Sequence, residues 1–156
     1  MFLYYFLAFA AATAIAIQAP INSRLGQALM GQPLMAALIS FSIGTVTLFI
    51  LCLFRADFNN LGPTLLQQPL WKLTGGVLGA LVVFCSALLP LKIGLGNFLF
   101  TVVVTQIIVA LIIDHFGLIG MPTKSIDLWR FLGALVMLCG LFIFFFGGKI
   151  AKQLLN

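Results

Sequence analysis

Charged residues are scarce in this sequence: Asp, Glu, Lys and Arg together make up 7 % of its 156 residues, whereas a soluble domain carries about 25 %. Hydrophobic types account for 63 %, and the mean hydropathy is +1.23. This composition excludes an ordinary soluble domain and places the chain in a membrane. Although the net charge is +5, no basic patch or aromatic-basic motif accompanies it, so we expect no nucleic-acid partner.

Motifs of enzyme chemistry and of metal binding are missing as well. There is one histidine, no metal-ligand cluster and no Gly-rich phosphate loop. The three cysteines, Cys52, Cys85 and Cys139, stand singly in apolar runs, without a CxxC pair. We therefore expect no enzyme activity, no metal and no cofactor, and we interpret the cysteines as small packing residues.

Five apolar segments are present, and a helix that crosses a bilayer needs roughly 20 residues. They cover about residues 2–29, 34–54, 71–89, 93–113 and 128–147, and polar or Gly/Pro-containing links separate them. The longest link, between the second and third segments, is too short for a soluble domain. The sequence thus predicts an all-α polytopic membrane protein. It forms a single five-helix domain over residues 1–156, with a tight link at 90–92.

The first segment carries two amide side chains in a broken pattern. Gln18 and Asn22 are four residues apart, so they share a helix face. Pro20 lies between them and removes a backbone donor, which predicts a kink. Polar amides inside a membrane need partners. Two interpretations stay open: the amides bind a substrate, or they hold neighbouring helices together.

A second polar stripe lies on the fourth segment, where polar residues recur at a spacing of four. We predict one midplane cavity lined by the first and fourth helices of two copies of the chain. Its substrate contacts would be Gln18, Asn22, Arg24, Asn97, Thr101, Thr105 and Gln106. Arg24 is the one plausible buried cation, and it would either attract an anionic group of the substrate or extend to the lipid headgroups.

No acidic residue falls near the middle of a span, so the usual proton-relay carboxylate is missing. Asp114 and His115 come closest, at the end of the fourth segment, where water reaches them. Histidine changes its charge near neutral pH, which makes this pair a candidate for gating or coupling. The alternative is a cap and interface anchor at the end of a span.

Positive charges are divided evenly between the two sides of the membrane. Five spans place four on each side: Arg55, Lys72, Lys124 and Arg130 on the N-terminal side, and Arg24, Lys92, Lys149 and Lys152 on the other. Orientation follows an excess of Lys and Arg on the cytoplasmic side. The balance therefore favours insertion in both orientations and an antiparallel dimer. One fixed orientation is the alternative.

Six stretches spread over nearly the whole chain carry a family resemblance: residues 18–26, 40–45, 75–79, Gln106, 113–122 and 130–134. Together they resemble the YdcZ-type family, formerly a domain of unknown function, of the drug/metabolite transporter (DMT) superfamily. The resemblance implies a multi-pass protein of the bacterial inner membrane. It also implies five helices, equivalent to half of a DMT (EamA-like) ten-helix inverted-repeat fold.

The resemblance implies a transporter superfamily but supplies no substrate. Together with the polar stripes and the charge balance, it leads us to predict a small-solute membrane transporter, most simply an exporter, which works by alternating access as an antiparallel dual-topology homodimer. Its partners would be membrane lipids and a small-molecule substrate, which the amide and hydroxyl side chains and Arg24 predict to be a neutral polar or weakly anionic metabolite. The related small multidrug resistance exporters carry a membrane-embedded Glu on the first helix, and this chain has none. The alternatives are half of a heterodimeric transporter or a non-transporting membrane subunit that stabilises or regulates a partner.

Overall fold

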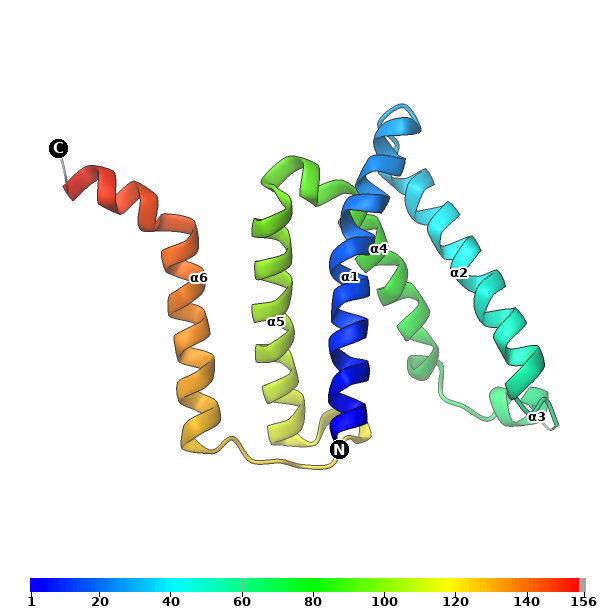
Figure 1. The fold of residues 1–156 in the computed structure, drawn as a ribbon. Helices are drawn as coiled ribbons and strands as arrows, with labels where there is room; N and C mark the ends of the chain where they lie inside the picture. Colours follow the sequence, from blue (N-terminus) through cyan, green and yellow to red (C-terminus); the bar gives the residue numbers. More distant parts are fainter. Residues whose placement is uncertain (60, 155–156) are drawn as a thin grey trace. The chain divides into compact units, whose positions relative to one another are not determined.

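The protein is represented by a computed structural model that describes residues 1–59 and 61–154 (Figure 1). Every regular element within those residues is a helix. In chain order they are α1 (Phe2–Ala28), α2 (Pro33–Arg55), α3 (Leu61–Leu66), η1 (Leu70–Leu73), α4 (Thr74–Ile93), α5 (Leu95–Phe116), η2 (Leu118–Gly120) and α6 (Leu128–Leu154).

Five helical segments are long and apolar enough to cross a membrane. They are Phe2–Ala28, Pro33–Arg55, Leu70–Ile93, Leu95–Phe116 and Leu128–Gly148. Large apolar side chains cover the outer faces of these helices, as a lipid environment requires. The predicted all-α fold with five transmembrane helices is therefore confirmed, and it is consistent with half of a ten-helix fold.

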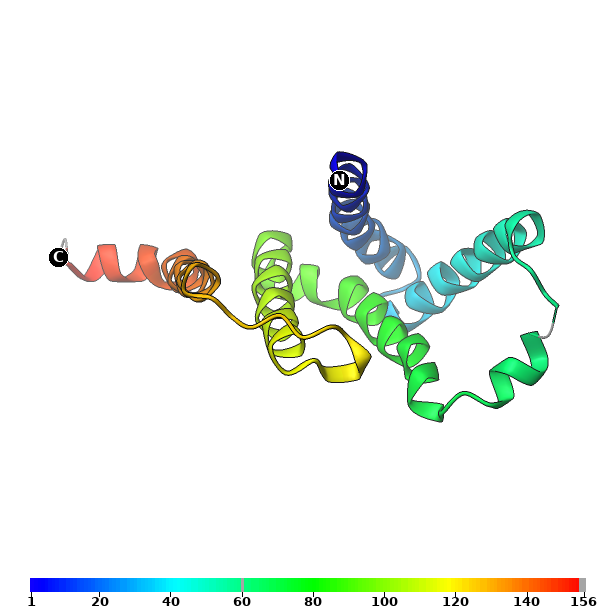
Figure 2. The same ribbon diagram turned by 90° about the horizontal axis from the view of Figure 1, so that it is seen from below.

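The chain divides into two compact units, Met1–Leu95 and Gly96–Asn156, and the single five-helix domain stays a prediction. In the first unit, α1, α2 and α4 pack against one another. They converge near the turn between α1 and α2 and spread apart toward the opposite end (Figures 1 and 2). The core lies at the converging end and consists of small residues, because Ala19, Ala36 and Ala87 are each at most 1 % exposed.

Small residues let these three backbones approach closely, which is the main source of helix association where lipid surrounds the protein. Gly26 on α1 is buried, and a Cβ at this position would lie 3.4 Å from the Cα of Pro33 on α2. A Cβ at Gly79 on α4 would lie 3.2 Å from Cζ of Phe41, also on α2. Both glycines therefore mark close contacts of α2 with its neighbours.

Proline lies inside two of the helices. Pro20 is inside α1, whose second half turns away from the line of the first (Figure 1), as the missing donor predicts. Pro90 is inside α4, which continues through the predicted link at 90–92 and ends at Ile93. The break falls instead at Gly94, whose φ of +88° and ψ of 145° suit only glycine.

The second unit contains α5, η2 and α6. The rings of Phe100 on α5 and Phe144 on α6 lie 5.0 Å apart between centroids. Between the helices, Gly117 and Gly120 have positive φ angles, and so does Ile119. The C-terminal part of α6, drawn in red, runs at an angle to the rest of the helix (Figure 1). The side chains of Lys149 and Lys152 lie outside the described part of the chain.

Candidate functional site

A hydrogen-bonded polar cluster joins the three helices of the first unit. Asn22 on α1 is 2 % exposed. Its Oδ1 accepts a hydrogen bond of 2.6 Å from the Ser40 hydroxyl on α2, and its Nδ2 donates at 3.2 Å to Oγ of Ser86 on α4. The Ser86 hydroxyl in turn donates to the carbonyl of Val83 at 2.8 Å. Asn22 thus contacts both neighbouring helices, as the helix-packing interpretation requires, and its contact with substrate stays a prediction.

A second hydrogen bond in this cluster replaces a backbone hydrogen bond that α4 lacks. Pro90 has no N–H, so the carbonyl of Ser86, four residues earlier, lacks its helical donor. The hydroxyl of Ser23 on α1 donates to this carbonyl at 3.0 Å. Neighbouring helices commonly satisfy carbonyls that proline frees in membrane spans. Pro90 therefore creates an acceptor that fixes α1 against α4.

Directly beside the cluster lies a cavity of about 190 Å³. Ser40 borders both the cluster and the cavity, and Gln18 on α1 lines the cavity one helical turn from Asn22. The remaining lining residues are Phe41, Gly44, Thr45, Leu48 and Val83. Among the described residues, no hydrogen-bond partner is found for the side-chain amide of Gln18. Gln18 therefore offers one donor and one acceptor group to whatever occupies this cavity.

Arg24 lies apart from this cavity. It is exposed on α1, and its Nη1 donates to Oε1 of Gln27 at 3.2 Å. The exposed guanidinium fits the expected extension to lipid headgroups. Its contact with an anionic substrate group stays a prediction.

The polar residues of α5 belong to the second unit. The Thr101 hydroxyl donates to the carbonyl of Asn97 at 2.8 Å, within its own helix. Thr105 and Gln106 are exposed. That these four residues share a cavity with Gln18 stays a prediction.

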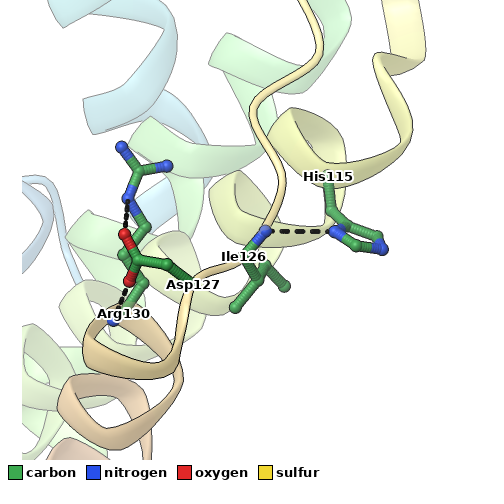
Figure 3. A network of polar contacts seen from close by, with 4 residues as sticks. All are labelled: His115, Ile126, Asp127 and Arg130. Carbon is green, nitrogen blue, oxygen red and sulfur yellow. Dashed lines mark hydrogen bonds and ion pairs between the residues drawn. The ribbon is translucent and has the colours of Figure 1, made fainter.

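Asp114 and His115 organise the loop after α5. The backbone N–H of Lys124 donates to the carbonyl of Asp114 at 2.7 Å, and the N–H of Ile126 donates to Nδ1 of His115 at 3.2 Å. Figure 3 shows this contact beside Asp127, which caps α6 through the Arg130 N–H at 2.7 Å and pairs with the Arg130 side chain at 3.9 Å. Nδ1 of His115 must be unprotonated to accept this bond. Gating by this pair stays a prediction.

Sequence reasoning did not single out Ser23 and Ser86. One signal could have found Ser86, because it precedes Pro90 by four residues and so carries the carbonyl that proline leaves free. Ser23 has no such signal, since only the packing of α1 on α4 brings its hydroxyl to that carbonyl. As for metals, the described residues contain no group of three or more His, Cys, Asp or Glu side chains placed to hold an ion.

Comparison with known proteins decides the family. Residues 3–143 match the family model described as “Putative inner membrane exporter, YdcZ”. The chain belongs to the YdcZ family. No curated protein and no solved structure matches it. As a YdcZ-family chain with five apolar spans, it is a multi-pass inner-membrane protein and a membrane transporter, a class distinct from enzymes.

The structure gives physical reasons for two stretches that carried the YdcZ resemblance. Residues 18–26 contain the Asn22 and Ser23 contacts and the close approach of Gly26 to α2. Residues 113–122 contain the acceptors of Asp114 and His115 and the two glycines with positive φ. The first stretch assembles three helices, and the second shapes the loop that leads into α6.

Proposed function

We propose that this transporter moves a small neutral polar or weakly anionic solute by alternating access, and that Gln18 is its principal contact in the first unit. The observation that carries the proposal is the unpartnered amide of Gln18 in a cavity beside a fully bonded cluster. Gln18 is exposed on its span, and an amide on a membrane span that forms no hydrogen bond within the protein is the kind of group a transporter presents to a polar substrate.

The size and charge of the cavity support a small solute. Its 190 Å³ correspond to about six water molecules at the roughly 30 Å³ that each occupies in the liquid. No charged side chain lines it. All three acidic residues, Asp57, Asp114 and Asp127, lie outside the middle of the spans, so a permanent cation would meet no counter-charge there.

We propose further that the working unit is an antiparallel homodimer, in which Asn97, Thr101, Thr105 and Gln106 of α5 complete the chamber. The even division of Lys and Arg between the two sides supports insertion in both orientations. An antiparallel pair would supply the two-fold symmetry that other transporters obtain from inverted repeats in one chain. Rocking of one copy against the other would then expose the chamber alternately to each side.

The test of the substrate class begins with thermal stability of the purified full chain. The probes are three panels of small neutral polar solutes, monocarboxylates and quaternary ammonium cations. We expect saturable stabilisation by a member of the first two panels. In proteoliposomes, Gln18→Ala should then lower flux of that solute at least ten-fold.

Thr47→Ala is the matched control, because the Thr47 hydroxyl bonds the carbonyl of Ile43 within α2 at 2.8 Å and does not line the cavity. It should leave flux unchanged. Stabilisation by the cations alone would overturn the proposed substrate class. Equal loss of flux in both variants would remove Gln18 from the site.

The test of the architecture is labelling from both faces of the membrane. In a chain with Cys52, Cys85 and Cys139 replaced by Ser, a cysteine is placed at Gln32, in the turn after α1, or at Asn59, after α2. Dual insertion predicts that an impermeant thiol reagent labels about half of the molecules from each side at both positions. Labelling of Gln32→Cys from one side only, and of Asn59→Cys from the other only, would rule out the antiparallel homodimer.

A further inference from the structure

Two more cavities of the first unit lie along α4, apart from the one that Gln18 lines. The smaller, of about 210 Å³, is at the converging end of the helices, where Gln27 and Lys92 are its long polar side chains. The larger, of about 470 Å³, is a groove between α2 and α4. Its lining is entirely apolar: Leu34, Met35, Ala37, Leu38, Phe41, Ala80 and Phe84.

The two cavities are consecutive along the same elements. On α4, Ala80 and Phe84 line the groove, and Leu88 and Leu91 line the smaller cavity. Their spacing of four, four and three residues places them on one helix face. On α2, Pro33 lines the smaller cavity and the next residue, Leu34, lines the groove. A cavity with polar side chains and an apolar groove about two helical turns long are thus neighbours along α2 and α4.

The polar end carries positive charge that no carboxylate of this unit balances. The one acidic residue within residues 1–95 is Asp57. It follows the far end of α2, a helix of 23 residues and therefore about 35 Å long. Arg24 adds a second cation, bonded through Nη1 to Oε1 of Gln27. That bond occupies the oxygen of Gln27 and leaves its NH₂ group, like the ammonium of Lys92, to donate to an anion.

We propose that these two cavities form a site for one anionic phospholipid, with its phosphate at Lys92 and Gln27 and one acyl chain in the groove between α2 and α4. Lys92 lies in the last turn of α4, at the end of a membrane span, where headgroup phosphates are found. Basic pockets between transmembrane helices bind lipid headgroups elsewhere. The apolar groove selects a lipid over a free anion, because a soluble anion would leave it empty. This site does not depend on the proposed transport function.

The role of the Lys92 charge is tested with the full-length protein in mild detergent. Native mass spectrometry measures the binding of phosphatidylglycerol and of phosphatidylcholine with identical acyl chains. One favourable cationic contact is expected to favour phosphatidylglycerol about five-fold. Lys92→Gln should abolish that preference. Lys72→Gln is the matched control: it removes one charge from the opposite end of the same span, where Lys72 bonds Gln68 at 2.7 Å. It should keep the preference.

The groove is tested by filling it. Ala80→Phe should lower binding of both lipids at least five-fold. Leu81→Phe, at the adjacent exposed position outside the groove lining, should change neither. If Lys92→Gln does not yield folded protein, Gln27→Leu tests the same end and should lower binding of both lipids, because both carry the phosphate to which the Gln27 NH₂ group would donate.

Four results would overturn the proposal. The first is displacement of phosphatidylglycerol by millimolar inorganic phosphate, which would assign the cations to a soluble anion. The second is equal loss of preference in Lys92→Gln and Lys72→Gln. The third is unchanged lipid binding in Ala80→Phe. The fourth is conversion of a dimer to monomers by Ala80→Phe without loss of lipid, which would assign the groove to a second copy of the chain.

Discussion

In the first unit the polar side chains buried in the spans bond to one another across three helices, whereas on α5 of the second unit the Thr101 hydroxyl bonds within its own helix and Gln106 is exposed. Asn22 has partners on α2 and α4. Thr101 bonds only the carbonyl one turn earlier, and Gln106 is exposed. The same residue types therefore stabilise one unit internally and leave the other with polar groups on its surface.

The difference separates two roles for a polar residue in a membrane span. Side chains that bond across helices fix a scaffold, and removing one leaves its buried partners unsatisfied. Exposed polar side chains on a span add little to the unit that carries them, and they need a partner from outside it. The first unit is therefore a preassembled scaffold, and α5 presents the polar face on which our proposed chamber depends.

The largest expected effect comes from removing one amide in each unit. Asn22→Ala takes the acceptor from Ser40 and the donor from Ser86, and we expect it to cost about 2 kcal/mol. Gln106→Ala removes an exposed amide and should cost less than about 0.5 kcal/mol. The measurement is unfolding by SDS in mixed micelles, followed by tryptophan fluorescence.

The two tryptophans allow each unit to be followed alone. Trp71 lies in η1 of the first unit and Trp129 in α6 of the second. In a Trp129→Phe background, Asn22→Ala should shift the transition that Trp71 reports. In a Trp71→Phe background, it should leave the transition that Trp129 reports in place. Equal shifts at both tryptophans would show that the two units unfold together, and the contrast drawn between them would fail.

A smaller effect is expected in the loop of the second unit. Gly117 and Gly120 both have positive φ, so alanine at either position should cost about 1 kcal/mol in backbone strain. A Cβ at Gly117 would also lie 2.7 Å from Cγ2 of Thr123, whereas at Gly120 nothing lies within 4 Å. Gly117→Ala should therefore lower the protection of residues 118–127 against hydrogen exchange more than Gly120→Ala does. Equal effects would show that the Thr123 side chain moves away from a Cβ at position 117 without destabilising the loop.

The sequence was sufficient for the fold class, because five long apolar segments separated by polar links leave few alternatives. It did not locate the break between the third and fourth spans. The sequence predicts the link at 90–92, but a proline can remain inside a membrane helix when a neighbour satisfies the freed carbonyl, and Ser23 does so. That contact joins residues 63 positions apart, and no local pattern encodes it.

The site was predictable in type and not in detail. The spacing of Gln18 and Asn22 placed both on one face, yet the structure separates their surroundings. Asn22 is held by two neighbouring helices, while Gln18 faces a cavity. The positions at which α2 and α4 cross α1 decide which of the two amides bonds to neighbouring helices. Those positions depend on helix packing, and the spacing of residues in the sequence does not reveal them.

The most specific effect concerns the bond that compensates for Pro90. Ser23→Ala removes the donor to the Ser86 carbonyl and should cost about 1 kcal/mol in the Trp71 transition. In a Pro90→Ala background the helix regains the N–H at position 90, which can reach that carbonyl itself. The same Ser23→Ala change should then cost almost nothing, so the double-mutant cycle should give a coupling of about 1 kcal/mol between residues 23 and 90.

Thr13→Ala is the control for this cycle, because the Thr13 hydroxyl on α1 bonds the Phe9 carbonyl of its own helix at 2.9 Å. It should show no coupling to Pro90. Equal costs of Ser23→Ala in both backgrounds would mean that the Ser23 hydroxyl stabilises the unit for a reason other than the carbonyl that Pro90 leaves free. Proline would then be tolerated in α4 without the hydrogen bond from Ser23 on α1. The bonds of Asn22 would remain as the explanation for the polar contacts between the helices of the first unit.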